Sequence, residues 1–167
     1  MNTEPLLALS NATVHYRHSE EPVLHQVNFA LHDGECVGLV GPNGCGKTTL
    51  LLTLVGLIPL HRGELRFQGR VVRGKADFVN LRRAVGFVFQ NPDDQLFSPT
   101  VLEDVAFGPL NLGLSQDEAL TRSQAILHHM ELEHLIHRQP HTLSGGQKRL
   151  VGLATVLVMQ PRILLLD

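Results

Sequence analysis

The sequence has no tryptophan and is poor in cysteine, aromatic residues and charge. Two cysteines in 167 residues are too few for a disulfide framework, so we expect a reducing compartment. Charged residues make up 18% and hydrophobic residues 43%, a balance that excludes a disordered chain. The net charge is −2 and no basic run is present, which argues against a protein that binds nucleic acid by neutralising phosphates.

The sequence also lacks the pattern of a signal peptide or a membrane span. The first basic residue is Arg17, so no positively charged segment precedes an apolar one. The longest apolar stretch, residues 50–60, is interrupted by Gly56 and Pro59, and a spanning helix needs ~20 apolar residues. We therefore expect a soluble protein, or one that reaches a membrane only through a partner.

Short strands and helices alternate along the chain, which predicts an α/β fold. Residues 23–31 alternate apolar and polar side chains, as a half-buried strand does, and Asp33-Gly34 is a tight turn. Residues 35–40 are mostly apolar and predict a buried strand of a parallel sheet. We further predict strands at 6–14, 63–67, 85–89 and 162–167, a turn at 19–22, and helices at 47–56, from 100 onward, at 115–130 and at 144–159.

Capping patterns mark the helix starts in the second half of the chain. Thr100 and Ser115 each precede a glutamate by three positions, which is the spacing of a capping box. Ser144 is a further residue of the N-cap type.

A glycine-rich loop precedes the first predicted helix. Residues 41–48 read Gly-Pro-Asn-Gly-Cys-Gly-Lys-Thr and fit the pattern G-x-x-x-x-G-K-[ST]. Glycines allow many backbone N–H groups to point at crowded phosphate oxygens, and a helix N-terminus favours an anion. Lys47 is expected to reach the β- and γ-phosphates, and the Thr48 hydroxyl to ligate Mg²⁺. The motif by itself predicts a P-loop nucleotide binder.

A second glycine-rich helix start, residues 143–147, reads Leu-Ser-Gly-Gly-Gln. It is again an anion site of backbone N–H groups, with Ser144 as the N-cap. One chain does not need two sites for a γ-phosphate, whereas two chains packed head to tail would use both. On these motifs the sequence resembles the ATP-binding-cassette (ABC) family, whose signature reads LSGGQ. The resemblance covers about residues 6–167. It implies a P-loop NTPase core with an N-terminal antiparallel β part and a helical subdomain.

The resemblance implies roles for further residues. Gln90 is similar to the family's Q-loop glutamine, which contacts Mg²⁺ and the attacking water. Asp167 ends a run similar to Walker B, and its carboxylate would hold the Mg²⁺ shell. Tyr16 stands where the family places an aromatic residue that stacks on adenine, with packing at a strand end as the alternative. The implied cofactors are ATP and Mg²⁺, with catalytic roles for Lys47, Gln90 and Asp167, Mg²⁺ ligation by Thr48, Gln90 and Asp167, and nucleotide contacts from Tyr16, Gly41, Pro42, Asn43, Gly44, Cys45, Gly46, Lys47, Thr48, Thr49, Ser144, Gly145, Gly146 and Gln147.

One segment indicates a particular subgroup of the ABC family. Residues 89–97, Phe-Gln-Asn-Pro-Asp-Asp-Gln-Leu-Phe, with two runs between 103 and 114, are similar to the ATPase of energy-coupling-factor importers, which include cobalt, nickel and vitamin systems. In that family two ATPases dock on an integral membrane coupling protein, and a separate membrane protein binds the substrate. Leu96 and Phe97, beside acidic residues 93–94, are expected to accept a partner's amphipathic helix. An ordinary acidic loop is the alternative.

The expected organisation is one ABC ATP-binding domain over 1–167. Its β-rich P-loop core is expected at about 1–90 and 160–167, and its helical signature subdomain at about 91–159. The implied partners are a second ATPase subunit, identical or paralogous, and the two membrane proteins, without nucleic acid. The implied location is the cytoplasmic face of the cell membrane.

The family's catalytic glutamate follows the Walker B carboxylate, but this sequence ends at Asp167. We expect a fragment with the C-terminal part of the core missing; a short chain that binds nucleotide without hydrolysing it is the alternative. A non-transport ABC ATPase is a further alternative. It is disfavoured because the stretch between the two motifs has neither heptads nor a C-x-x-C pair.

Histidines and one cysteine need a separate interpretation. The ten histidines include His134, His137 and His141, whose spacing matches no good metal site, so we expect surface histidines. Cys45 occupies a loop position where the family usually has a small residue such as serine. We expect a passive small residue there, with a reactive thiol at the helix N-terminus that ATP shields from alkylation as the alternative.

Overall fold

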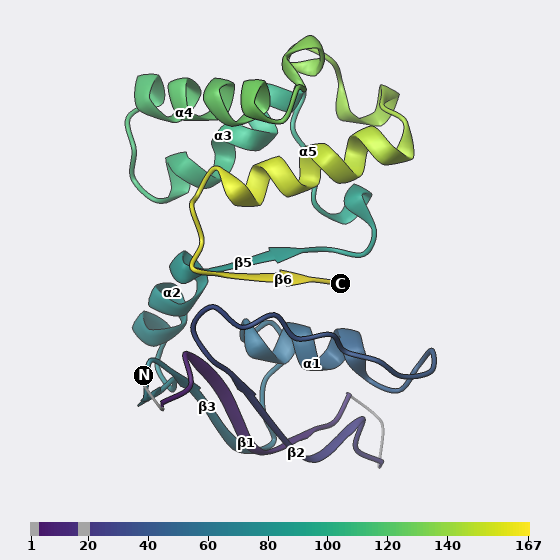
Figure 1. Ribbon diagram of the computed structural model, residues 1–167, viewed down its shortest axis with the longest axis vertical. Coiled ribbons are helices and arrows are strands. Elements are labelled where there is room, and N and C mark those ends of the chain that lie inside the picture. Colours follow the sequence, from purple (N-terminus) through teal and green to yellow (C-terminus); the bar gives the residue numbers. More distant parts are fainter. Residues whose placement is uncertain (1–3, 17–20) are drawn as a thin grey trace. The chain divides into compact units, whose positions relative to one another are not determined.

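The computed structural model describes residues 4–16 and 21–167, so part of the expected 19–22 turn lies outside the described residues. The chain divides into two units, Met1–Arg82 and Arg83–Asp167 (Figure 1). The first unit holds an antiparallel sheet, and the second holds three longer helices and two parallel strands. The contacts place the strand after Ala84 and the last strand of the chain with the helices of the second unit.

Strand β1 (Leu7–Val14) is the centre of the sheet in the first unit. It pairs antiparallel with β2 (Leu24–Leu31) on one side and with β3 (Arg62–Phe67) on the other. A short β4 (Arg70–Val71) extends the sheet beyond β3. The three longer strands confirm the predicted ones, whereas β4 was not predicted. Most of β1 is buried, and both of its edges are paired with neighbouring strands.

Helix α1 (Lys47–Leu54) packs its leucines into the first unit and contacts β1. Leu50, Leu51 and Leu54 are buried, so the predicted helix at 47–56 is confirmed, although it ends at Leu54. Because this helix begins directly after the glycine-rich loop, its burial fixes where the loop ends.

Helix α2 (Lys75–Ala84) was not predicted from the sequence. The Asp77 carboxylate accepts hydrogen bonds from the backbone N–H groups of Gly74 and Arg73 at 2.9 and 3.0 Å, which closes the first turn. These two bonds hold the pKa of Asp77 below its ordinary value. An acidic residue in the first turn, shortly after a glycine, was the local signal for this helix.

Residues 35–40 form no strand, so the prediction of a buried strand there is wrong. Val37 and Val40 are 42% and 99% exposed, and the segment has no ladder to a neighbouring strand. A strand is stable only where another backbone completes its hydrogen bonds, and apolar composition does not provide that neighbour. The turn before the segment is confirmed, since the N–H of Glu35 donates to the carbonyl of His32 at 3.2 Å.

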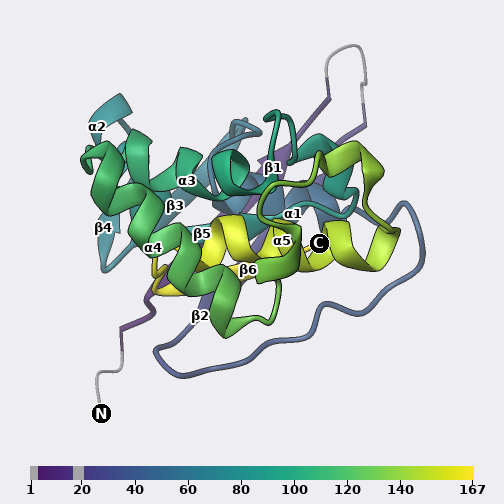
Figure 2. The same cartoon turned by 90° about the horizontal axis from the view of Figure 1, so that it is seen from above.

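The second unit is built on α3 (Val101–Asn111), α4 (Gln116–His129) and α5 (Gly145–Leu157). Helix α3 packs against both of the others (Figure 2). Strands β5 (Val85–Val88) and β6 (Ile163–Leu166) form a parallel pair, and α5 contacts β5. Short 3-10 turns lie at Pro92–Asp94, Glu133–Leu135 and Pro140–Thr142. The buried core consists of Leu96, Val101, Val105, Leu127, Leu132, Leu135, Leu143, Val151, Ala154 and Val158.

The predicted helix caps of this unit are confirmed. The Thr100 side chain accepts from the N–H of Glu103, and Ser115 forms a complete capping box with Glu118. The hydrogen bonds from Ser115 also hold the pKa of the Glu118 carboxyl below its ordinary value. Local residue patterns therefore fix where these helices begin.

Candidate functional site

The glycine-rich loop leads directly into α1. Gly46 is the N-cap residue, with φ 97° and ψ 11° in the left-handed region, and its carbonyl accepts from the N–H of Leu50 at 2.9 Å. Residues 41–45 and Thr48 are exposed. The first N–H groups of α1 have no intrahelical acceptors, so this end of the helix is suited to an anion.

The Lys47 ammonium spans the loop. Its Nζ donates to the carbonyl oxygens of Gly41 and Pro42, each at 2.9 Å, and lies 3.9 Å from the Cys45 sulfur. The positive side chain of the loop thus folds back over residues 41–42 at the start of the loop. A polyphosphate placed at this loop would meet that ammonium and the helix N-terminus together.

Tyr16 follows β1 and contacts the first turn of α1. Its hydroxyl lies 2.9 Å from Thr49 Oγ1, and 47% of the side chain is exposed. Thr49 itself is buried, and its carbonyl accepts from the Thr53 hydroxyl at 2.7 Å. The structure therefore brings Tyr16 to the helix of the P-loop while leaving much of its ring accessible. Thr49 offers a ligand little side-chain surface.

The Leu-Ser-Gly-Gly-Gln segment opens α5 with a complete capping box. Ser144 Oγ accepts from the N–H of Gln147 at 3.3 Å, and Gln147 Oε1 accepts from the N–H of Ser144 at 3.0 Å. The predicted N-cap is confirmed. Gly145 and Gly146 are exposed, and a Cβ at either would meet nothing within 4 Å. Bare backbone at a helix N-terminus is a second place where an anion would be stabilised.

Gln90 and Asp167 lie at the same end of the parallel strand pair. Val88 pairs with Leu166, and the N–H of Asp167 donates to the carbonyl of Val88 at 3.1 Å. Gln90 follows Val88 by two residues and is exposed. The carboxyl ends of parallel strands are where α/β sheets place their polar functional groups. An amide and a carboxylate there supply the oxygen donors that Mg²⁺ prefers.

Two links between residues 89–97 and α5 were missed by the sequence analysis. Lys148, which follows the glycine-rich segment, forms an ion pair with Asp93. The Gln95 amide donates to the carbonyl of Gly152 and to Thr155 Oγ1, each at 2.7 Å. No sequence pattern indicates that residues so far apart in the chain are in contact. Both ends of each link nevertheless lie in segments that the sequence analysis had identified as functional.

An exposed aromatic pair lies beside these links. The rings of Phe97 and Phe107 meet edge to face with centroids 4.9 Å apart, and they are 66% and 47% exposed. Leu96 belongs to the buried core, so the expectation that it presents an apolar surface with Phe97 is wrong. Buried Asp104 accepts from the N–H groups of Phe97 and Ser98 at 3.1 and 2.8 Å, which holds the Phe97 turn in place.

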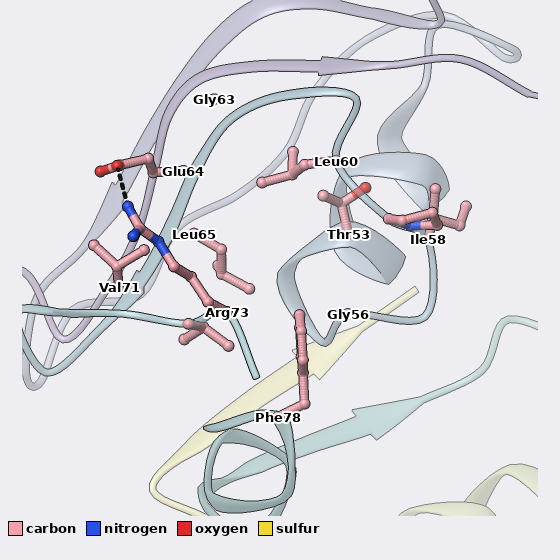
Figure 3. A pocket seen from close by; sticks show the side chains of 12 residues that line it. Thr53, Gly56, Ile58, Leu60, Gly63, Glu64, Leu65, Val71, Arg73 and Phe78 are labelled. Atoms are coloured by element: carbon pink, nitrogen blue, oxygen red, sulfur yellow. Dashed lines mark hydrogen bonds and ion pairs between the residues drawn. The ribbon is translucent and has the colours of Figure 1, made fainter. Parts of the chain in front are cut away.

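A separate pocket of about 330 Å³ lies between α1, the segment after it and β3 (Figure 3). Apolar side chains line most of it, and the Phe78 ring lies beside Gly56. At one side Arg73 pairs with Glu64 at 3.3 Å. None of the loop residues 41–48 lines this pocket, so it is not part of the nucleotide site that the motifs indicate.

Comparison with known proteins gives a consistent result. The sequence model of a family described as ABC transporter matches residues 24–167. The chain is 48% identical over 146 residues to the energy-coupling factor transporter ATP-binding protein EcfA of Methanocaldococcus jannaschii, which covers 87% of this chain and 52% of that protein. The chain spans between 47% and 74% of the length of eight such curated relatives.

Solved structures give the same fold. The structure of cbiO1 from Clostridium perfringens, described as part of the ABC transporter complex cbiONQ, matches with a TM-score of 0.83 at 35% identity, covering 98% of this chain and 65% of that one. A dimeric ATP-binding cassette, MJ0796, in a post-hydrolysis state with ADP and Pi, matches with a TM-score of 0.83 at 32% identity, covering 96% and 73%. The predicted α/β fold of the P-loop NTPase type is therefore confirmed. Among the described residues, no helix combines the length and apolarity that crossing a membrane requires.

Proposed function

Because this chain belongs to the ABC transporter family, we propose that it is the ATP-binding part of a subunit that couples ATP binding and hydrolysis to transport. The observation that carries this proposal is the presence of two glycine-rich helix N-termini, one opening α1 and one opening α5. Each presents exposed backbone N–H groups of the kind that stabilise phosphate. A protein that binds one nucleotide per chain uses both only if it pairs with another chain.

The loop of the first unit would bind the triphosphate. Backbone N–H groups of residues 41–46 would surround the β-phosphate, and Lys47 would exchange its two carbonyl partners for phosphate oxygens. Tyr16 would stack on adenine with the exposed part of its ring, and Thr49 would orient that ring through its hydroxyl.

Oxygen donors of three kinds would hold Mg²⁺. The Thr48 hydroxyl, the Gln90 amide oxygen and the Asp167 carboxylate match the hard-ligand chemistry of that ion. When bound, Mg²⁺ neutralises the charge that builds up on the phosphates. Gln90 would also orient the attacking water. Its position beside the end of β6 supports that role.

The capped start of α5 would act on the nucleotide of a second subunit. Ser144 and Gln147 satisfy each other, which holds the N–H groups of Gly145 and Gly146 toward solvent rather than toward the chain's own side chains. We infer a head-to-tail dimer in which each P-loop faces the partner's Ser-Gly-Gly-Gln segment. The similarity to a dimeric ATP-binding cassette bound to ADP and Pi supports the pairing of two chains.

Mixing two inactive variants of the intact subunit tests the dimer. Lys47→Ala removes the phosphate-binding ammonium, and Ser144→Arg fills the signature end, so each alone should abolish ATP hydrolysis. In a mixed dimer, the Ser144→Arg P-loop faces the unchanged signature of the Lys47→Ala chain, and this site is intact. Activity should therefore return on mixing. If mixing restores nothing while both variants fold and dimerise, the composite site is wrong.

A finer proposal concerns the transport system. We propose an importer of the energy-coupling-factor type that takes up a transition-metal ion such as cobalt or nickel, or a vitamin, with the subunit held at the cytoplasmic face of the membrane by its partners. The similarity to EcfA and to cbiO1 supports this proposal. The integral membrane coupling protein would contact the exposed Phe97–Phe107 pair, with Asp94 beside it for a basic group.

Site-directed cross-linking tests this docking surface. A cysteine replacing Phe97 in the intact subunit should cross-link to the co-expressed coupling protein, whereas a cysteine replacing exposed Glu133 should not. Phe97→Ala should weaken co-purification of the coupling protein and leave ATP binding unchanged, because Phe97 is not part of the proposed nucleotide site. Equal cross-linking at both positions would contradict the proposal.

A further inference from the structure

The antiparallel sheet of the first unit contains a second pocket, of about 410 Å³. Its walls come from β1, the start of β2 and the start of β3, and it shares no residue with the glycine-rich loop. We call it the histidine pocket. It is lined by Asn11, Thr13, His15, Pro22, His25, Gln26, His61, Arg62 and Gly63.

The histidine pocket lies where both ladders of β1 are interrupted. The register of β1 with β2 shifts on either side of Ala12, and the register with β3 shifts between Ser10 and Thr13. Irregularities of this kind bend strands and re-aim side chains, and they are common beside functional sites. Here the lining residues Asn11, Gln26 and Gly63 lie at these interruptions.

Three lining residues have left-handed backbone at these interruptions. The φ angles are 49° at Asn11, 51° at Gln26 and 96° at Gly63. A Cβ at Gly63 would lie 2.5 Å from the carbonyl oxygens of Ser10 and Asn11, so only glycine fits there. Non-glycine residues in this region carry backbone strain, which the fold must offset elsewhere. The pocket is thus a built feature of the strand pairing.

Among residues 4–16 and 21–167, the charged and titratable groups of the lining are all basic. They are His15, His25, His61 and Arg62, and no described aspartate or glutamate lines the pocket. The rings of His15 and His61 lie 5.0 Å apart, so their charges repel when both rings are protonated. An anion near them would remove that repulsion.

Two acidic residues, Glu21 and Glu64, are adjacent in sequence to lining residues but do not line the histidine pocket. Glu64 follows Gly63 but pairs with Arg66 and Arg73. The hydrogen bond from Arg66 is the main cause that holds the pKa of Glu64 below its ordinary value. The guanidinium group of Arg73 lowers it further. Glu21 precedes Pro22 and is not among the lining residues.

A lining with three histidines could also suggest a metal site. Among residues 4–16 and 21–167, no three His, Cys, Asp or Glu side chains are grouped so that they could hold one. The Arg62 guanidinium in the same lining also disfavours a cation.

We propose that the histidine pocket binds a small oxyanion, a phosphate or carboxylate group, through Arg62 and the imidazole N–H groups. Arg62 offers the paired donors that such groups accept, and Thr13, Asn11 and Gln26 add neutral ones.

Histidine NMR spectra test the proposal in the intact subunit. The Lys47→Ala background removes the main phosphate ligand of the P-loop, and the assigned imidazole resonances of His15, His25 and His61 report on the histidine pocket. Inorganic phosphate and citrate are titrated separately, so that the two arms distinguish a phosphate from a carboxylate ligand. The resonances of His15, His25 and His61 should shift saturably with at least one of them.

Substitutions in and outside the lining distinguish specific anion binding in the histidine pocket from general effects of ionic strength. Arg62→Gln should weaken binding by about tenfold or more, since a charge-assisted hydrogen bond is lost. Arg70→Gln, in β4 and outside the lining, is the matched control and should change nothing. If Arg62→Gln does not fold, His25→Asn provides the same comparison, with His32→Asn as its control. Shifts that do not saturate with either anion, or equal effects of variant and control, overturn the proposal.

Discussion

The side-chain amide of Gln95 donates a hydrogen bond to the backbone carbonyl of Gly152 at 2.7 Å. The same nitrogen donates to Thr155 Oγ1 at 2.7 Å, and Gln95 Oε1 accepts from the N–H of Phe89 at 3.2 Å. One part-buried side chain therefore joins the residue before Gln90 to α5, the helix that begins with the signature segment. Within the second unit, the two elements proposed to meet nucleotide are linked through it.

Gln95→Glu should break this link with little change in volume. A carboxylate cannot donate to Gly152 or Thr155, so two hydrogen bonds are lost and the free energy of unfolding should fall by ~1–3 kcal/mol. In the intact subunit we expect slower ATP hydrolysis with a nearly unchanged KM for ATP, because Gln95 would position other groups rather than touch nucleotide. Denaturant unfolding and steady-state kinetics measure the two effects. Gln139→Glu, at an exposed position, is the control, and equal losses in both variants would argue against the link.

Tyr16 should contribute to ATP affinity through its ring more than through its hydroxyl. Tyr16→Phe loses only the contact to Thr49, and we expect at most a few-fold weaker binding. Tyr16→Ala loses stacking on the base, which is worth ~1–3 kcal/mol, or roughly five- to 150-fold in Kd. Titration with a fluorescent ATP analogue distinguishes the two variants. Similar affinities for both would show that the ring packs on protein instead.

ATP with Mg²⁺ should protect Cys45 from alkylation. The thiol is exposed within the glycine-rich loop, and its sulfur lies 3.9 Å from the Lys47 ammonium. A bound triphosphate would cover the loop, so the alkylation rate should fall several-fold at saturating ATP. Cys36 is also exposed and lies outside the loop, which makes it an internal control. Mass spectrometry of the two cysteine peptides measures both rates, and identical protection of both would point to a global effect.

The capping box of α4 should make stability depend on pH in the acidic range. Hydrogen bonds from Ser115 lower the folded-state pKa of Glu118 relative to the unfolded state. The resulting stabilisation is fully present above the unfolded pKa, for which the ordinary value is 4.5, and is lost as the pH falls through the folded pKa. Glu118→Gln should therefore be less stable than the unchanged chain at pH 7, and the difference should shrink toward about pH 3. Unfolding curves across this range test the sign, with exposed Glu133→Gln as the control.

Elements with local signals were predictable from the sequence. Period-2 alternation identified β2, and the capping residues Thr100, Ser115 and Ser144 placed three helix starts. Residues 35–40 failed because a continuous apolar run says nothing about which backbone completes a ladder. Helix α2 was missed because its residues are polar overall and only Leu81 of its side chains is buried, although the helix is amphipathic.

The same distinction applies to the candidate site. The two glycine-rich motifs were visible because phosphate chemistry requires bare backbone next to a helix start. The Gln95 link and the histidine pocket were not, because each joins residues that only tertiary structure brings together. His15, His25 and His61 have no common spacing, and they share a lining because β1 pairs with both β2 and β3.

The ladder between β5 and β6 has a consequence for any motion of the second unit. Val88 is paired with Leu166, and its carbonyl also accepts from the N–H of Asp167. Since successive side chains of a strand point to opposite faces, a slip of one residue would turn every side chain of β6 to the opposite face of the pair. The ends of the two strands, Val88 and Leu166, can therefore shift past each other only in discrete steps. A rotation of the whole unit would carry the two strand ends together, with no gradual sliding between them.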